Sequence, residues 1–118
     1  MNDGSMALQQ IVDRLTIERI IDIVKEQSEL IVYWPAKALQ CLVAHVLAIL
    51  SGRRILVDQD TAYESGRYAA SPTNGQWARL PRHIQDLVAE FDKEFAGRLC
   101  DKQDALRFLR KFKQREGR

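Results

Sequence analysis

Cys41 and His45 are the first residues whose types and spacing could do chemistry. They stand four positions apart, so a helix through this stretch would present both on one face, as two ligands of a metal ion. A tetrahedral site needs further ligands, but the sequence has no CxxC pair and one other histidine, His83. We therefore expect Cys41 and His45 to be packed in the core, and we predict neither a metal nor a cofactor.

Patterns that support catalysis are missing from the sequence. It contains no GxSxG nucleophile motif, no phosphate-binding GxxxxGK loop and no GxGxxG, and its six glycines are scattered. The paired acids Asp58 and Asp60 fit helix caps better than an acid–base pair. We predict that the protein is not an enzyme.

Five aromatic and arginine residues instead indicate a protein-binding surface. Such side chains, when they stand outside a regular apolar stripe, are the types enriched at protein–protein hot spots. The alternative is that the aromatic members simply cover one end of the core. The predicted partner-binding residues are Tyr63, Arg67, Tyr68, Trp77 and Arg79.

The C-terminal stretch suggests a second binding chemistry. Residues 98–118 hold eight basic and three acidic side chains, whereas residues 1–52 hold four basic and six acidic ones. A basic stripe can neutralise phosphates, although basic residues near a helix C-terminus also complement the helix dipole. Nucleic-acid binding is therefore the alternative function, and its candidate residues are Arg107, Arg110, Lys111 and Lys113.

A central helix has to position these residues. Pro35 fits a first helical position and Gly52 a left-handed stop, and the residues between them are apolar on nearly every side. A helix of this kind must be enclosed by protein or lipid. The apolar run is about 15 residues, which is short of the ~20 that a membrane span needs. We predict a core helix over about 35–51 and no contact with a membrane.

The N-terminal part predicts two further helices. One apolar stripe ends at Leu15 and the next begins at Ile17, and the two are out of phase by ~200° at ~100° per residue. Thr16 is a good N-cap and favours a break, but a continuous helix buried on two sides is the open alternative. The second helix is predicted to run to Tyr33, where Pro35 stops it.

The middle of the chain is less regular. Residues 53–60 are predicted to be an extended connector, because no second strand is visible to pair with them. Residues 61–70 predict a marginal helix, which Gly66 weakens by ~1 kcal/mol relative to alanine. Residues 71–75 contain Pro, Asn and Gly and predict a turn.

Two amphipathic helices complete the chain. The first opens at Pro81 and is expected to end near Gly97. The second is capped by Asp101, with acidic residues in its first turn and basic residues in its last.

Together these elements predict an all-α fold. We expect a single helical domain over residues 1–118, a compact bundle of five to six helices around the central one, with a flexible leader at 1–5 and a frayed basic tail at 113–118. Two apolar-flanked cysteines are expected to be reduced and buried. The N-terminus shows no apolar targeting segment. Together with the reduced cysteines, this predicts a cytoplasmic protein.

Three stretches give the chain a resemblance to a known family: AKALQCLVAHVLAIL, TAYESGRYAA and IQDLVAEFDKEF. In size and helical layout it resembles the small quorum-sensing antiactivators of the QslA type. The resemblance implies a protein that binds a LuxR-type transcription factor at its dimerisation surface and so blocks DNA binding.

The hypothesis is thus a cytoplasmic, non-enzymatic inhibitor that binds a transcription factor. A homodimer is expected, because the central helix and the N-terminal helices offer more apolar surface than one small core readily hides. Two alternatives stay open: a nucleic-acid-binding or nucleoid-associated accessory protein that uses the basic last helix, and a structural or phage-type accessory subunit.

Overall fold

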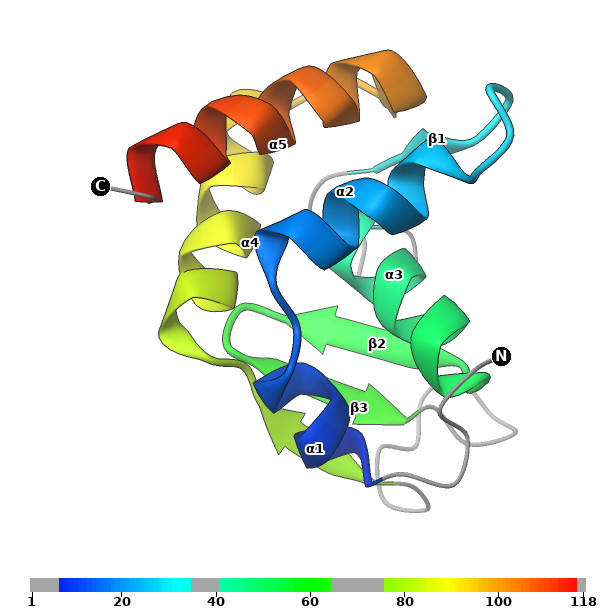
Figure 1. Cartoon of the computed structure of the whole chain (residues 1–118), viewed down its shortest axis with the longest axis vertical. Coiled ribbons are helices and arrows are strands. Elements are labelled where there is room, and N and C mark those ends of the chain that lie inside the picture. Colours follow the sequence, from blue (N-terminus) through cyan, green and yellow to red (C-terminus); the bar gives the residue numbers. More distant parts are fainter. Residues whose placement is uncertain (1–6, 35–40, 65–75, 117–118) are drawn as a thin grey trace.

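The chain forms helices and short strands, and the computed structural model describes residues 7–34, 41–64 and 76–116. Figure 1 shows a three-stranded sheet at one end of the molecule and the last helix at the other. In chain order the elements are α1 (Leu8–Asp13), α2 (Ile17–Lys25), β1 (Val32–Tyr33), α3 (Leu42–Ser51), β2 (Ile55–Asp58), β3 (Thr61–Glu64), β4 (Trp77–Arg79), α4 (Arg82–Glu94), β5 (Cys100–Asp101) and α5 (Lys102–Glu116).

The fold is mixed α/β, so the all-α prediction is wrong. The strands form two antiparallel sheets, one of β1 and β5 and one in the order β2-β3-β4. Helices α1 and α3 contact the three-stranded sheet through β4 and β2 respectively. Figure 1 shows α4 along one side of the molecule, between this sheet and α5.

The hairpin of β2 and β3 replaces the predicted connector at 53–60. Asp58 pairs with Thr61, so the loop has two residues, and Gln59 in it has a φ of 47°. Two-residue hairpin loops need a positive φ, which Gly, Asn or Asp usually supplies. Because a glutamine takes this conformation here, no ordinary turn signal marks the hairpin.

The helix predicted at 61–70 is also wrong where the structure describes it. Residues 61–64 form β3, and Ala62 of this strand is fully buried between its partners Val57 and Ala78. Small inward residues hide the alternation of buried and outward side chains that usually marks a strand. Residues 65–70 and the predicted turn at 71–75 lie outside the described residues.

The break at Thr16 is confirmed. Helix α1 ends at Asp13 and α2 begins at Ile17, and the Thr16 hydroxyl oxygen accepts a hydrogen bond from the backbone N–H of Arg19 at 3.1 Å. The cap satisfies one of the backbone donors that a helix start leaves open. The alternative of one continuous helix is therefore excluded.

Helix α2 is shorter than predicted, because it ends at Lys25 and not at Tyr33. The ammonium group of Lys102 donates to the backbone oxygens of Lys25 and Gln27, both at 2.8 Å. A cation at a helix C-terminus satisfies carbonyls that have no partner inside the helix. The chain then turns, and Val32 and Tyr33 pair with Asp101 and Cys100 as a two-stranded ribbon.

The central helix α3 is confirmed in place but begins later than predicted. Cys41 has an extended backbone and its sulfur accepts a hydrogen bond from Ala44 N–H at 3.4 Å, so the helix starts at Leu42. Gly52 ends it with a φ of 68°, as predicted. Residues 35–40 lie outside the described residues. Within the described part, no helix is long and apolar enough to cross a membrane.

The two C-terminal helices follow the prediction closely. Asp101 accepts a hydrogen bond from the backbone N–H of Asp104 at 2.8 Å and so caps α5. Helix α5 continues to Glu116, so residues 113–116 of the predicted frayed tail are helical. The apolar stripes of α4 and α5 meet in a cluster of four buried rings, those of Phe91, Phe95, Phe108 and Phe112.

The side chain of Gln9 closes the outer edge of β4. Its amide nitrogen donates to the Arg79 carbonyl at 2.9 Å, and its oxygen accepts from the Arg79 N–H at 3.0 Å. The amide therefore imitates a neighbouring strand at one residue of an exposed edge, where unpaired backbone groups invite association. It also ties α1 to the sheet.

Replacing Gln9 with alanine removes both hydrogen bonds, and we expect the free energy of unfolding to fall by about 1 kcal/mol. Urea denaturation measures the change. The matched control is Asp13→Ala, which removes only the Gln9–Asp13 contact. Equal losses in the two variants would contradict the role assigned to the edge contact.

Candidate functional site

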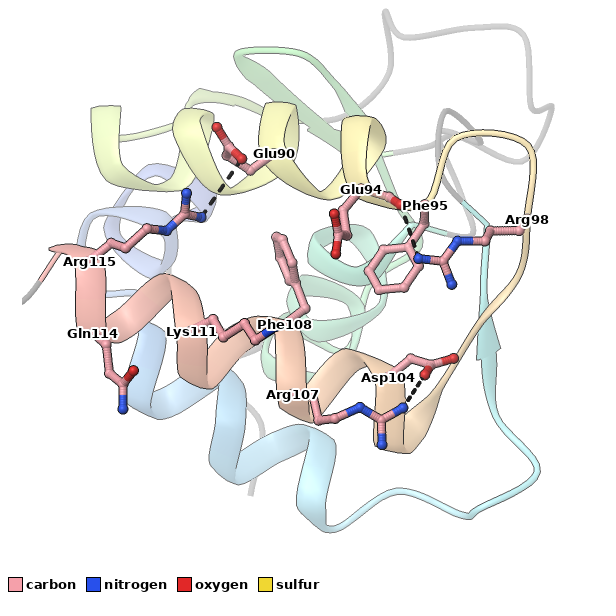
Figure 2. A pocket seen from close by; sticks show the side chains of 10 residues that line it. All are labelled: Glu90, Glu94, Phe95, Arg98, Asp104, Arg107, Phe108, Lys111, Gln114 and Arg115. Carbon is pink, nitrogen blue, oxygen red and sulfur yellow. Dashed lines mark hydrogen bonds and ion pairs between the residues drawn. The ribbon is translucent and has the colours of Figure 1, made fainter.

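A groove of about 690 Å³ lies between α4 and α5, and we call it the α4–α5 groove. Phe95 and Phe108 lie at its base, with ring centroids 5.8 Å apart and rings nearly perpendicular. Both rings are buried against the core, so the base is held by packing and not by mobile side chains. Figure 2 looks into this groove.

Two of the cations that line the groove are paired with acids. Arg115 on α5 lies 3.7 Å from the carboxylate of Glu90 on α4, which links the two helices at one end. Arg107 forms an ion pair with Asp104, one turn earlier on α5. These contacts are exposed, so each contributes at most about 1 kcal/mol to stability, but they orient the side chains.

Two further cations in the groove have no carboxylate at ion-pair distance among the described residues. They are Arg98, which follows α4, and Lys111 on α5. The guanidinium of Arg98 lies 4.6 Å from the centre of the Phe95 ring and donates to the backbone oxygen of Glu94 at 3.2 Å. Figure 2 shows the Glu94 carboxylate on the same wall. The groove therefore offers the positive charge of Arg98 and Lys111 on both sides of an aromatic base, and beside them the Glu94 carboxylate, which has no cation at ion-pair distance among the described residues.

Of the four predicted nucleic-acid-binding residues, two form ion pairs within the chain and two do not. Lys113 lies 2.9 Å from the carboxylate of Glu18 on α2, and Arg107 is paired with Asp104. Arg110 and Lys111 have no carboxylate at ion-pair distance in the described part of the chain. Half of the basic stripe is therefore already neutralised, and Arg107 and Lys111 belong to the groove.

The predicted partner-binding residues lie elsewhere, on the three-stranded sheet. Tyr63 and Trp77 face each other across β3 and β4, and the Trp77 side chain is exposed. Arg79 lies 3.9 Å from the carboxylate of Asp60. Arg67 and Tyr68 lie outside the described residues. The structure thus brings together three of the five residues, Tyr63, Trp77 and Arg79, on one face of the sheet, at the opposite end of the molecule from α5 (Figure 1).

An exposed apolar row on the ribbon of β1 and β5 was missed from the sequence. Leu30, Val32 and Trp34 alternate with the inward residues Ile31 and Tyr33, which is the period of a strand. Extending the pairing of Tyr33 with Cys100 by one residue sets Leu99 beside Trp34. The available signal was this alternation, which the reading of residues 17–33 as one helix concealed. We call Leu30, Val32, Trp34 and Leu99 the ribbon row.

Cys41 and His45, the pair with metal-ligand spacing, serve in packing. The His45 ring meets the Tyr33 ring edge-on at 5.4 Å, and its Nε2 lies 3.4 Å from the side-chain oxygen of Gln27. Burial lowers the pKa of His45. No group of three His, Cys, Asp or Glu side chains suited to a metal ion occurs among the described residues.

Because burial lowers the folded-state pKa of His45, its contribution to stability is fully present above about pH 6.5 and is lost as the pH falls below that value. We expect the melting temperature of the native protein to drop between about pH 7.5 and about pH 5, and to drop less in His45→Gln. Calorimetry at both pH values measures this. An identical drop in both proteins would show that His45 does not cause it.

Both cysteines are buried and free, as predicted. Burial raises the pKa of the Cys41 thiol to about 11 and is the main cause that raises the pKa of the Cys100 thiol to about 12. The thiolate is the reactive form, so we expect both to resist iodoacetamide in the native protein and to react rapidly in urea. Mass spectrometry follows the reaction, and rapid native labelling of either cysteine would contradict this description.

Comparison with known proteins adds no family to this picture. Searches against protein families, curated proteins and solved structures found no match to the chain. The resemblance to quorum-sensing antiactivators stays a prediction.

Proposed function

We propose that this protein is a non-enzymatic interaction module that binds a segment of another protein in the α4–α5 groove. The observation that carries the proposal is the pair of cations, Arg98 and Lys111, beside the aromatic base of Phe95 and Phe108. An acidic side chain of the partner would meet the cations, and an apolar neighbour would contact the edges of the rings.

The dimensions of the groove favour a polypeptide segment as the ligand. Along α5 it extends from Asp104 to Arg115, which is about 16 Å at 1.5 Å per residue. Its volume is within the range of small-ligand sites, but those sites enclose most of the ligand, whereas this groove is partly open to solvent. A helical or extended segment can use the length without being enclosed.

A partner segment bound in this groove would be blocked only while it stays bound, without any chemical change. The charged side chains on its walls are exposed and give selectivity and association rate more than affinity, and the ring edges of Phe95 and Phe108, which are 3% and 8% exposed, add a small apolar contribution. The packing of Phe91 and Phe95 against Phe108 keeps α4 and α5 together before a partner arrives. Activity would therefore follow stoichiometry, with no turnover.

Two narrower proposals come from the sequence. The resemblance proposes a LuxR-type transcription factor as the partner, masked at its dimerisation surface. Of its three stretches, TAYESGRYAA begins as strand β3 and not as a helix. The other two stretches contain α3 and most of α4, so the helical layout behind the resemblance holds only in part. The second proposal is a cytoplasmic location, which suits two buried free thiols.

Selection from a displayed library of random 12-residue peptides tests the groove. We expect enriched peptides to combine Asp or Glu with a bulky apolar residue, and the double variant Arg98→Glu/Lys111→Glu to bind them at least tenfold more weakly. That loss corresponds to at least about 1.4 kcal/mol. Lys93→Glu is the matched control, because it reverses an exposed charge on α4 outside the groove.

Circular dichroism of the variants checks that the exposed substitutions leave the fold intact. Equal binding by the double variant and the native protein, or enrichment of basic peptides, would overturn the proposal.

Titration with duplex DNA at two salt concentrations addresses the alternative function, nucleic-acid binding. Affinity that falls steeply with salt and is lost in Arg110→Gln/Lys111→Gln would favour nucleic acid instead.

A further inference from the structure

The ribbon row is an apolar surface that the groove does not use. The exposed fractions are 90% for Leu30, 43% for Val32, 42% for Trp34 and 43% for Leu99. Single exposed apolar residues are ordinary, but a contiguous set on one small element marks an interaction surface. This surface lies on β1, β5 and the residues that adjoin them, away from the three-stranded sheet (Figure 1).

The opposite face of the two-stranded ribbon packs against the core and fixes the position of the ribbon row. Tyr33 and Cys100, on the other side of the two strands, are buried in the core, and the Tyr33 ring contacts His45. The turn that presents Leu30 is fixed by Lys102, whose ammonium binds the backbone of Lys25 and Gln27. The row is therefore presented by a fixed backbone and not by a loose loop.

We propose that a second copy of the chain docks on the ribbon row, antiparallel to the first about a twofold axis near Val32. Leu30 and Trp34 place a large apolar side chain at each end of the row and Val32 a smaller one at its centre, so each end of the row can meet the opposite end of a copy. In that arrangement Leu30 of one chain packs against Trp34 and Leu99 of the other. A twofold contact of this kind uses the same surface on both chains.

The charges at the two ends of the row complement each other in the same arrangement. Glu29 adjoins Leu30, and its side chain is 65% exposed although Lys102 lies 3.4 Å away and the Gln103 amide donates to both carboxylate oxygens at 3.2 Å. Arg98 adjoins Leu99 at the other end; its guanidinium lies over the Phe95 ring at the end of the α4–α5 groove and has no carboxylate at ion-pair distance among the described residues. The antiparallel dimer brings Glu29 of each chain toward Arg98 of the other. Asp101, which pairs with Val32, lies on the same face and brings one carboxylate of each chain near the axis; this like-charge contact weakens the dimer, although each carboxylate accepts a hydrogen bond from Asp104 N–H.

The size of the ribbon row sets the expected affinity of the dimer. Stable interfaces bury about 800 Å² per partner, and four partly exposed side chains with two flanking charges fall at or below this size. We therefore expect a weak dimer whose population rises with concentration. Analytical ultracentrifugation of the native chain between about 1 µM and about 1 mM measures it. A monomer throughout this range would overturn the proposal.

Leu30→Glu tests the surface, because a residue that is 90% exposed can be replaced without loss of core packing. We expect dimerisation to weaken at least tenfold. The matched control is Trp77→Glu, which places the same charge on the exposed face of the three-stranded sheet and should leave the dimer unchanged. No effect of Leu30→Glu, or an equal effect of both variants, would show that the dimer uses another surface.

A mixing experiment tests the arrangement itself. Glu29→Arg and Arg98→Glu should each weaken their own dimer, because both contacts become like-charged. An equimolar mixture restores opposite charges at both ends, so we expect the mixed dimer to be at least tenfold tighter than either variant alone. No gain on mixing would overturn the antiparallel arrangement. Lys111→Glu should leave dimerisation unchanged, which separates this proposal from the groove.

Discussion

The hydrogen bonds of the Lys102 ammonium join the end of α2 to the start of α5, and much of the structure depends on them. They satisfy carbonyls that α2 would otherwise leave open, so the helix stops at Lys25 and the chain turns toward β1. Strand β1 pairs with β5, which immediately precedes Lys102. The same contact therefore sets both the ribbon and the position from which α5 departs to form one wall of the groove.

The amphipathic part of the fold was predictable from the sequence, whereas the sheet was not. Helices α4 and α5, the stop at Gly52 and the break at Thr16 follow from period, capping and glycine geometry, which are local properties. The three-stranded sheet depends on pairing between β3 and β4 and on a hairpin loop with glutamine at a positive φ. Neither leaves a local pattern, and small inward residues such as Ala62 and Ala78 conceal the strands further.

For the candidate sites too, residue types could be recognised from the sequence, whereas their placement could not. Lys111 and Arg107 stood out as cations, but their place in a groove depends on how α5 crosses α4, which the sequence does not state. Tyr63 and Trp77 were recognised by residue type, and strand register brings them together. The ribbon row was missed because Leu30 and Val32 fell inside the helix predicted to end at Tyr33, although the strand period fits them better.

The central claim is that the α4–α5 groove is the binding site, and amide chemical-shift mapping tests it most directly. A ¹⁵N-labelled sample is titrated with an acidic, apolar peptide obtained by selection. We predict that the largest shifts fall on the groove residues around Glu94, Arg98 and Lys111, while those of the three-stranded sheet stay small. Shifts centred on Tyr63 and Trp77, with the groove unaffected, would contradict the account.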